Sequence, residues 1–203
     1  CESARGNEFN AWSVGNPPEH ETILPFTRFM GGPMDYTPGI FQIKMNYYNP
    51  DKKEQVHTTL SKQLALYVTM YSPLQMAADY PENYERFMDA FQFIKDVAVD
   101  WDDSKYLEAE PGDYVTIARK AKGKNEWFIG AITDESERTA IIPLSFLDSD
   151  RKYTAEIYAD AKDAHWEKNP MAYEITRKSV TCKDVLEIKL APGGGCAIRI
   201  SDQ

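Results

Sequence analysis

The stretch that decides the fold is residues 114–132, YVTIARKAKGKNEWFIGAI. It contains two short runs rich in Val, Ile, Tyr and Thr, and a segment of Lys, Gly and Asn separates them. Short runs of β-branched and aromatic residues bounded in this way are typical of β-strands. The stretch therefore predicts two strands that follow each other closely along the chain.

The same pattern continues from Lys105 to the C-terminus. Seven such runs follow one another roughly every 10 to 14 residues without a helical pattern between them, which is typical of an antiparallel sandwich or barrel. The expected strands are 114–119, 126–132, 138–144, 153–159, 173–179, 185–190 and 196–201. We interpret Gly193-Gly194-Gly195 as a hairpin turn before the last strand, because a phosphate cradle would need a helix after it. The second half is predicted to be an all-β domain.

Two helical patterns precede this region. Within Val56–Tyr71 the apolar residues recur at the spacing of a helix that packs on one face, and Pro73 ends the pattern. A second helix is expected over Tyr84–Ile94, entered after Pro81 and ended by the acidic residues Asp100–Asp103. The first 50 residues show no period and are dense in Gly, Pro, Asn and Asp, which indicates functional loops.

Composition excludes several classes of protein. The chain has 203 residues, of which 42% are hydrophobic and 27% are charged, so it is neither disordered nor low in complexity. No apolar run is long enough to span a membrane. The net charge of -9 repels phosphate backbones, so we expect no nucleic-acid partner.

The cysteines and the common catalytic motifs are uninformative. Cys1, Cys182 and Cys196 lack the CxxC spacing of zinc and redox sites, so we expect packing residues. A bridge between Cys182 and Cys196 stays open for an oxidising compartment. The sequence has no GxSxG, P-loop or GxGxxG motif.

The segment Glu2–Trp12 holds the first candidate site residues. Glu2 and Glu8 lie six positions apart beside Arg5, so their carboxylates could coordinate a hard cation or divide acid and ligand roles. The alternative is a pair of solvated surface glutamates. Trp12 and neighbouring amide and aromatic residues favour a sugar-binding cleft, in which Trp12 would contact substrate.

Further polar residues could contact substrate. His20 follows two prolines and could donate to a substrate hydroxyl, or its ring could be satisfied by backbone. Asp35 lies in a rigid Pro/Gly loop, where substrate contact competes with a turn role. His57 is expected to be structural. His165 and Trp166 could form a small sugar platform, with loop packing as the alternative.

Several motifs together resemble those of glycoside hydrolase family 97. They are ESARGNE (2–8), NPPEH (16–20), LPFTR (24–28), GPMDYTPG (32–39), PLQMAADYP (73–81), GDYVTIAR (112–119), WFIGA (127–131) and LAPGGG (190–195). The family comprises α-glucosidases and α-galactosidases of gut and environmental Bacteroidetes. The resemblance covers almost the whole chain.

The resemblance implies a fold class of α/β plus all-β. Family members combine an N-terminal β-super-sandwich, a central (β/α)8 TIM barrel and a C-terminal antiparallel β-domain. Residues 1–103 would be the C-terminal part of the catalytic barrel, and residues 104–203 would be the antiparallel β-sandwich domain. In barrel enzymes the site lies at the carboxyl ends of strands, where the Glu2–Trp12 loop would fall.

The resemblance also implies a chemistry. Glu8 resembles the family's general acid, and Glu2 resembles a ligand of its Ca²⁺ ion, which Glu8 would also contact. The base or nucleophile would come from the preceding domains of the same polypeptide, so we expect this chain alone to be inactive. The substrate would be a malto-oligosaccharide cleaved at α-glucosidic bonds, in the periplasm or outside the cell.

Two alternatives remain open. One is a retaining α-galactosidase of the same family. The other is a non-catalytic module that binds glycan through Trp127, His165 or Trp166, or that only braces the barrel.

Overall fold

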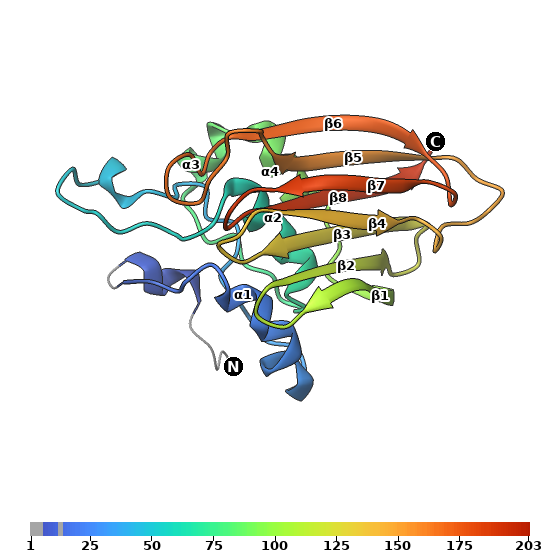
Figure 1. Cartoon of the computed structure of the whole chain (residues 1–203), viewed down its shortest axis with the longest axis horizontal. Helices are drawn as coiled ribbons and strands as arrows, with labels where there is room; N and C mark the ends of the chain where they lie inside the picture. The colour runs from blue at the N-terminus through green and yellow to red at the C-terminus, as the bar shows by residue number, and fades with distance from the viewer. Residues whose placement is uncertain (1–5, 12–13) are drawn as a thin grey trace.

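The computed structural model describes residues 6–11 and 14–203, except for the side chains of Glu8 and Ala11. Its C-terminal half consists of two antiparallel sheets (Figure 1). The larger sheet has the order β1 (Trp101–Glu110), β2 (Tyr114–Ala121), β3 (Glu126–Thr133), β8 (Gly195–Asp202), β5 (Tyr153–Asp160) and β6 (Tyr173–Val180). The smaller sheet pairs β4 (Arg138–Pro143) with β7 (Val185–Leu190). The antiparallel β-domain is therefore confirmed, and all seven predicted strands are present.

The eighth strand, β1, was not expected. The acidic residues Asp100–Asp103 predict the exit of a helix, but the strand begins at Trp101 and pairs with β2. It lies at the edge of the sheet, much of it is exposed, and its register shifts twice. Charged residues on an edge strand prevent it from pairing with other chains. Because β1 is rich in such residues, its sequence lacks the apolar alternation of a strand with a buried face.

The central strands of the larger sheet bury both of their faces. One face packs on β4 and β7 through a core that includes Ile129, Ala140, Ile142, Leu186 and Ile198. The opposite face packs on the helices of the N-terminal half. That core joins the two halves of the chain, because it combines Leu64, Val68 and Phe93 with Ile117 and Phe128. The division at residues 103 and 104 stays a prediction, and the halves share one hydrophobic core.

Helix α2 (Leu60–Thr69) is the central element of the N-terminal half. It lies against β3 and β8, and Thr59 caps its N-terminus by accepting a hydrogen bond from the Lys62 N–H at 3.2 Å. The predicted helix over Val56–Tyr71 is confirmed in a shorter form. The predicted single apolar face is wrong, because all ten residues of α2 are buried.

The second predicted helix is broken in two. Helix α3 (Pro81–Glu85) and helix α4 (Met88–Asp96) are separated by Arg86 and Phe87. Phe87 has φ -138° and ψ 49°, which is outside the helical region. The turn lets Phe87, Phe91 and Tyr84 pack around the fully buried ring of Phe41.

The rest of the N-terminal half is made of loops and short helical turns. These are η1 (Asn7–Ala11), α1 (His20–Ile23), η2 (Leu24–Phe26), η3 (Arg28–Gly31) and η4 (Met45–Tyr47). Within 6–11 and 14–100 the only β-pairing is the isolated bridge between Lys44 and Gln55. The expected C-terminal part of a (β/α)8 barrel is therefore wrong for the described residues. A parallel strand needs neighbouring strands to bond its backbone, and these residues supply none.

The glycine-rich turn before β8 differs from the expected hairpin. It links β7 in the smaller sheet to β8 in the larger sheet, so the two strands that it joins are not partners. Gly193 has φ +63°, and a Cβ there would lie 2.5 Å from the Trp166 side chain. Cys196 is buried on β8 and Cys182 is half-buried, and both thiols are free.

Asp160, at the end of β5, holds this turn in place. Its Oδ2 accepts hydrogen bonds from the backbone N–H groups of Ala191 and Gly195 at 2.9 and 2.8 Å. Burial raises the pKa of Asp160 to about 6, although the hydrogen bonds from the two N–H groups oppose that rise. The carboxyl group therefore joins the end of β5 to both sides of the turn.

We expect Gly130→Ala to destabilise the protein by about 1 to 3 kcal/mol, because α2 has no room to accept the added methyl group. A Cβ at Gly130 would lie 2.6 Å from the Ala65 carbonyl oxygen and 3.0 Å from the Val68 Cβ. Chemical denaturation measures the loss. Gly31→Ala is the control, since its nearest neighbour would be 3.9 Å away. Equal stability of the two variants would contradict this packing.

Asp160 should make stability depend on pH. Between its ordinary pKa of 3.8 and about 6 the folded state holds a proton that the unfolded state has lost. The free energy of unfolding contributed by this group should therefore fall as pH rises from 4 to 6, by about 3 kcal/mol at most. Denaturation of wild type and Asp160→Asn at each pH isolates it, since the variant lacks this titration. Parallel pH profiles would contradict the prediction.

Candidate functional site

The segment that carries Glu8 is held from one side by Asn7. The Asn7 backbone N–H donates to Thr37 Oγ1 at 2.7 Å, and its Nδ2 donates to the Thr37 carbonyl at 2.9 Å and to Gln63 Oε1 at 3.2 Å. Asn7 is 1% exposed. The residue before Glu8 is therefore fixed both to the loop around Thr37 and to helix α2.

Two further asparagines hold the other side of the segment. Asn10 Nδ2 donates to the Asn7 carbonyl at 3.0 Å, and Asn10 Oδ1 accepts from the Asn16 N–H at 2.9 Å. Asn16 Nδ2 donates to the Gly6 carbonyl at 3.1 Å. A side chain at Gly15 would collide with Asn10 Oδ1, so this closed loop requires glycine there. The backbone on both sides of Glu8 is thus set by buried amide groups.

Gln63 on α2 connects this segment to the Pro/Gly loop. Its Oε1 also accepts hydrogen bonds from the N–H groups of Gly39 and Ile40 at 2.9 and 3.1 Å. Its Nε2 donates to Thr58 Oγ1 at 2.8 Å. One buried side chain therefore positions the Glu8 segment and the loop that follows Asp35.

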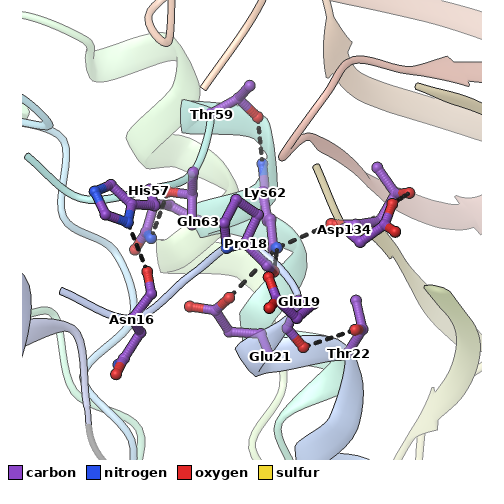
Figure 2. A network of polar contacts seen from close by, with 12 residues as sticks. Asn16, Pro18, Glu19, Glu21, Thr22, His57, Thr59, Lys62, Gln63 and Asp134 are labelled. Carbon is purple, nitrogen blue, oxygen red and sulfur yellow. Dashed lines mark hydrogen bonds and ion pairs between the residues drawn. The ribbon is translucent and has the colours of Figure 1, made fainter. Parts of the chain in front are cut away.

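Lys62, the neighbouring residue on α2, connects a third segment (Figure 2). Its Nζ donates to the carbonyls of Pro18 at 2.6 Å and Thr133 at 3.0 Å, and lies 3.4 Å from Glu21 Oε2. The side chains of Lys62 and Glu21 are 0% and 2% exposed. Glu21 Oε1 accepts a hydrogen bond from the Tyr36 hydroxyl at 3.1 Å. A buried ion pair thus holds the Pro18–Glu21 segment.

His57 contacts the same segment from the start of α2. Its Nδ1 lies 2.8 Å from the Asn16 carbonyl oxygen (Figure 2), and its ring meets that of Trp166 edge-on at 4.8 Å between centroids. The expected structural role of His57 agrees with these contacts. Trp166 also packs on Gly193 and stacks on His165, so these two rings serve loop packing. Trp127 is 4% exposed and packs on Phe146, which leaves little of it to contact a glycan.

The structure describes only some of the site residues that the sequence predicts. Glu2, Trp12 and the side chain of Glu8 lie outside the described residues. His20 begins α1 and is half-buried, and its backbone N–H donates to the Pro17 carbonyl at 3.0 Å. Asp35 is also half-buried and precedes Tyr36. The three segments that carry Glu8, His20 and Asp35 meet at α2, while the roles of these side chains stay predictions.

Sequence reasoning missed the residues that bring the segments together. The helical pattern over Val56–Tyr71 assigns no role to Lys62 or Gln63, and the amide beside Trp12, that of Asn10, is expected to line a sugar-binding cleft. One signal in the sequence indicated that this helix is buried: few of the residues around Lys62 and Gln63 are charged. Polar groups on a helix that is buried on all sides must find partners within the protein.

The donor set for a metal ion is only partly described. Ca²⁺ takes six to eight oxygen ligands, mainly from carboxylates, carbonyls and water. Glu2 and Glu8 are carboxylates and suit it chemically. Within 6–11 and 14–203, no group of three His, Cys, Asp or Glu side chains could hold a metal ion. In the same part of the chain no helix has the length and apolar character to cross a membrane.

Comparison with known proteins agrees with these features. Residues 100–201 match the family model described as "Glycosyl-hydrolase 97 C-terminal, oligomerisation". A solved family 97 enzyme from Pseudoalteromonas sp. strain K8, in complex with acarbose, is 48% identical over the whole chain with a TM-score of 0.93. A variant of an enzyme from the same strain in complex with panose is 47% identical, also with a TM-score of 0.93.

A curated relative points to the same family. The retaining alpha-galactosidase of Bacteroides thetaiotaomicron is 36% identical over 98% of this chain. The chain spans 30% of that relative and 31% of the two solved structures. The two-sheet domain entered at Trp101, together with the family match over residues 100–201, shows that this chain belongs to glycoside hydrolase family 97.

Proposed function

We propose that this chain is the C-terminal portion of an α-glycosidase in which Glu8 is the general acid. The observation that carries the proposal is the backbone around Glu8, which buried hydrogen bonds of Asn7, Asn10 and Asn16 hold in one conformation. Acid catalysis needs a proton donor held within hydrogen-bond reach of the leaving oxygen. A rigid support for the residue that bears the carboxyl group meets that need.

In this proposal Glu8 protonates the glycosidic oxygen as the bond to the anomeric carbon breaks. A second carboxylate acts on the opposite side of the sugar and comes from the part of the protein that precedes this chain. If it is a base that activates water, the two carboxyl groups are about 6.5 to 9.5 Å apart and the configuration inverts. If it is a nucleophile, they are about 5 to 5.5 Å apart and the configuration is retained.

We propose an α-glucosidic substrate of the malto-oligosaccharide type. The support is the 48% and 47% identity to enzymes solved with acarbose and panose, which are both built with α-glucosidic linkages. The curated relative named as a retaining alpha-galactosidase is 36% identical, so an α-galactoside is the second candidate. The two sugars differ in the orientation of one hydroxyl group.

We also propose that Glu2 and Glu8 take part in a Ca²⁺ site, with the remaining ligands from outside the described residues. When bound, the ion would add positive charge beside the substrate. That charge lowers the pKa of a nearby carboxyl group, whereas a general acid must keep its proton near neutral pH. Contact with bound substrate or exclusion of water would have to counter the ion. A periplasmic or extracellular location stays a prediction.

In the full-length protein, Glu8→Gln should lower kcat/KM for maltose by about 100- to 10,000-fold, which is the usual contribution of a positioned acid. The loss should be much smaller for α-glucosyl fluoride, because fluoride leaves without protonation. Steady-state kinetics on both substrates give the comparison. Glu82→Gln, an exposed glutamate on α3, is the control and should match wild type on both.

Three results would contradict the proposal. Maltose hydrolysis that survives Glu8→Gln would remove the acid role. Equal loss on maltose and on the fluoride would indicate a role other than proton donation. A higher kcat/KM for p-nitrophenyl α-galactoside than for the matching α-glucoside in wild type would replace the proposed substrate with the second candidate.

A further inference from the structure

We propose that Lys62 is a positioning residue for the glycosidase site, in that its buried ammonium group sets where the segments carrying His20 and Asp35 lie. This inference rests on the proposed function and deepens it. It concerns a helix residue that does not itself contact substrate. Four contacts support it: those of Lys62 with Pro18, Thr133 and Glu21, and that of Glu21 with Tyr36.

The first observation is the set of oxygen atoms around the Lys62 ammonium group. It has three N–H donors, and it has three oxygen partners: Pro18 O at 2.6 Å, Thr133 O at 3.0 Å and Glu21 Oε2 at 3.4 Å (Figure 2). No part of the side chain is exposed. Two carbonyl oxygens accept hydrogen bonds from the ammonium group and one carboxylate forms an ion pair with it, so the ammonium group couples the positions of all three oxygens.

The second observation is where those partners lie in the sequence. Pro18 and Glu21 flank Glu19 and His20, so the segment that bears His20 is held at both ends. Glu21 in turn binds the Tyr36 hydroxyl, and Tyr36 directly follows Asp35. Two of the three residues that the sequence predicts to contact substrate, His20 and Asp35, are thus next to groups that the Lys62–Glu21 pair holds.

The third observation is the link to the β-domain. Thr133 is the last residue of β3, so its carbonyl has a position fixed by the sheet. The Thr133 N–H donates to the Gly194 carbonyl, which ties it to the turn before β8. Lys62 therefore couples the position of the segment that carries His20 to the position of the antiparallel sheet. This gives the C-terminal domain a part in setting the geometry of the site.

Stability alone is a weak explanation for this arrangement. Removing an ammonium and a carboxylate from water is costly, and well-packed apolar side chains of similar size often stabilise a protein as much or more. An apolar residue at position 62 would fill the space but would leave the carbonyls of Pro18 and Thr133 without a donor. The charged pair provides directional bonds that an apolar pair cannot.

The test compares Lys62→Met, Glu21→Gln and the double variant in the full-length protein. Lys62→Met alone leaves Glu21 as a buried carboxylate without its cation, so it should lower the melting temperature strongly. The double variant removes both charges and should recover much of that loss. Its kcat/KM for maltose should nevertheless stay on the order of 100-fold below wild type, because misplacement of about 1 Å costs that much.

Arg119→Met is the matched control. Arg119 is also a buried cation, 6% exposed, and its Nε donates to the Val68 carbonyl at 2.7 Å near the other end of α2. We expect this variant to lose stability and to keep wild-type kcat/KM. If the double variant recovers activity together with stability, or if Arg119→Met loses as much activity as the double variant, the positioning role is wrong.

A second measurement separates this inference from the proposed function. Hydrogen exchange reports on the N–H groups of Thr22 and Gly39, which donate to Glu19 O and Gln63 Oε1. Both should exchange faster in the double variant than in Arg119→Met. Unchanged exchange would overturn the positioning role even in an active enzyme. Faster exchange in a protein that hydrolyses no α-glycoside would support it while refuting the proposed function.

Discussion

The rest of the structure depends on the close packing of helix α2 against the larger sheet. At Gly130 on β3 and Gly195 on β8, a side chain would come within 3 Å of the helix backbone. The two glycines therefore let the helix lie directly on the backbone of the two central strands. The hydrophobic core closes around this contact, since it includes Leu64 and Val68 from the helix together with Phe128 from the sheet.

Burial of α2 on every side places a strict demand on its polar residues. A buried donor or acceptor without a partner costs about 1 to 3 kcal/mol, and more if it is charged. Lys62 and Gln63 meet this demand with the loops that cover the helix, because backbone carbonyls and N–H groups of those loops point at them. The same bonds that satisfy the helix hold the loops in one arrangement.

The sheet determines the position of the proposed site in two steps. The sheet positions α2 through the two glycines, and α2 positions three loop segments through two neighbouring side chains. The asparagine network then extends this order to the backbone on both sides of Glu8. A β-domain that contains no proposed catalytic group can influence chemistry in this way, because positions are passed on through rigid, buried contacts.

The sequence by itself determined the elements whose pattern is local. Seven strands followed from short runs of β-branched and aromatic residues, and α2 followed from its apolar spacing. The charged strand β1 was not predicted, because an edge strand does not need runs of β-branched and aromatic residues. The residue types of Glu8, His20 and Asp35 also sufficed to mark them as candidates.

Only the tertiary structure decided which of these elements meet. The barrel units that the resemblance implied do not form in the described residues, since parallel strands depend on partners far away in the sequence. The apolar spacing of α2 predicted one packed face, whereas the structure buries all ten of its residues, because periodicity records the spacing of apolar residues and not the number of faces that are covered. The convergence of three loops on Lys62 and Gln63 joins residues 23 to 56 positions apart, and no local pattern encodes contacts over such separations.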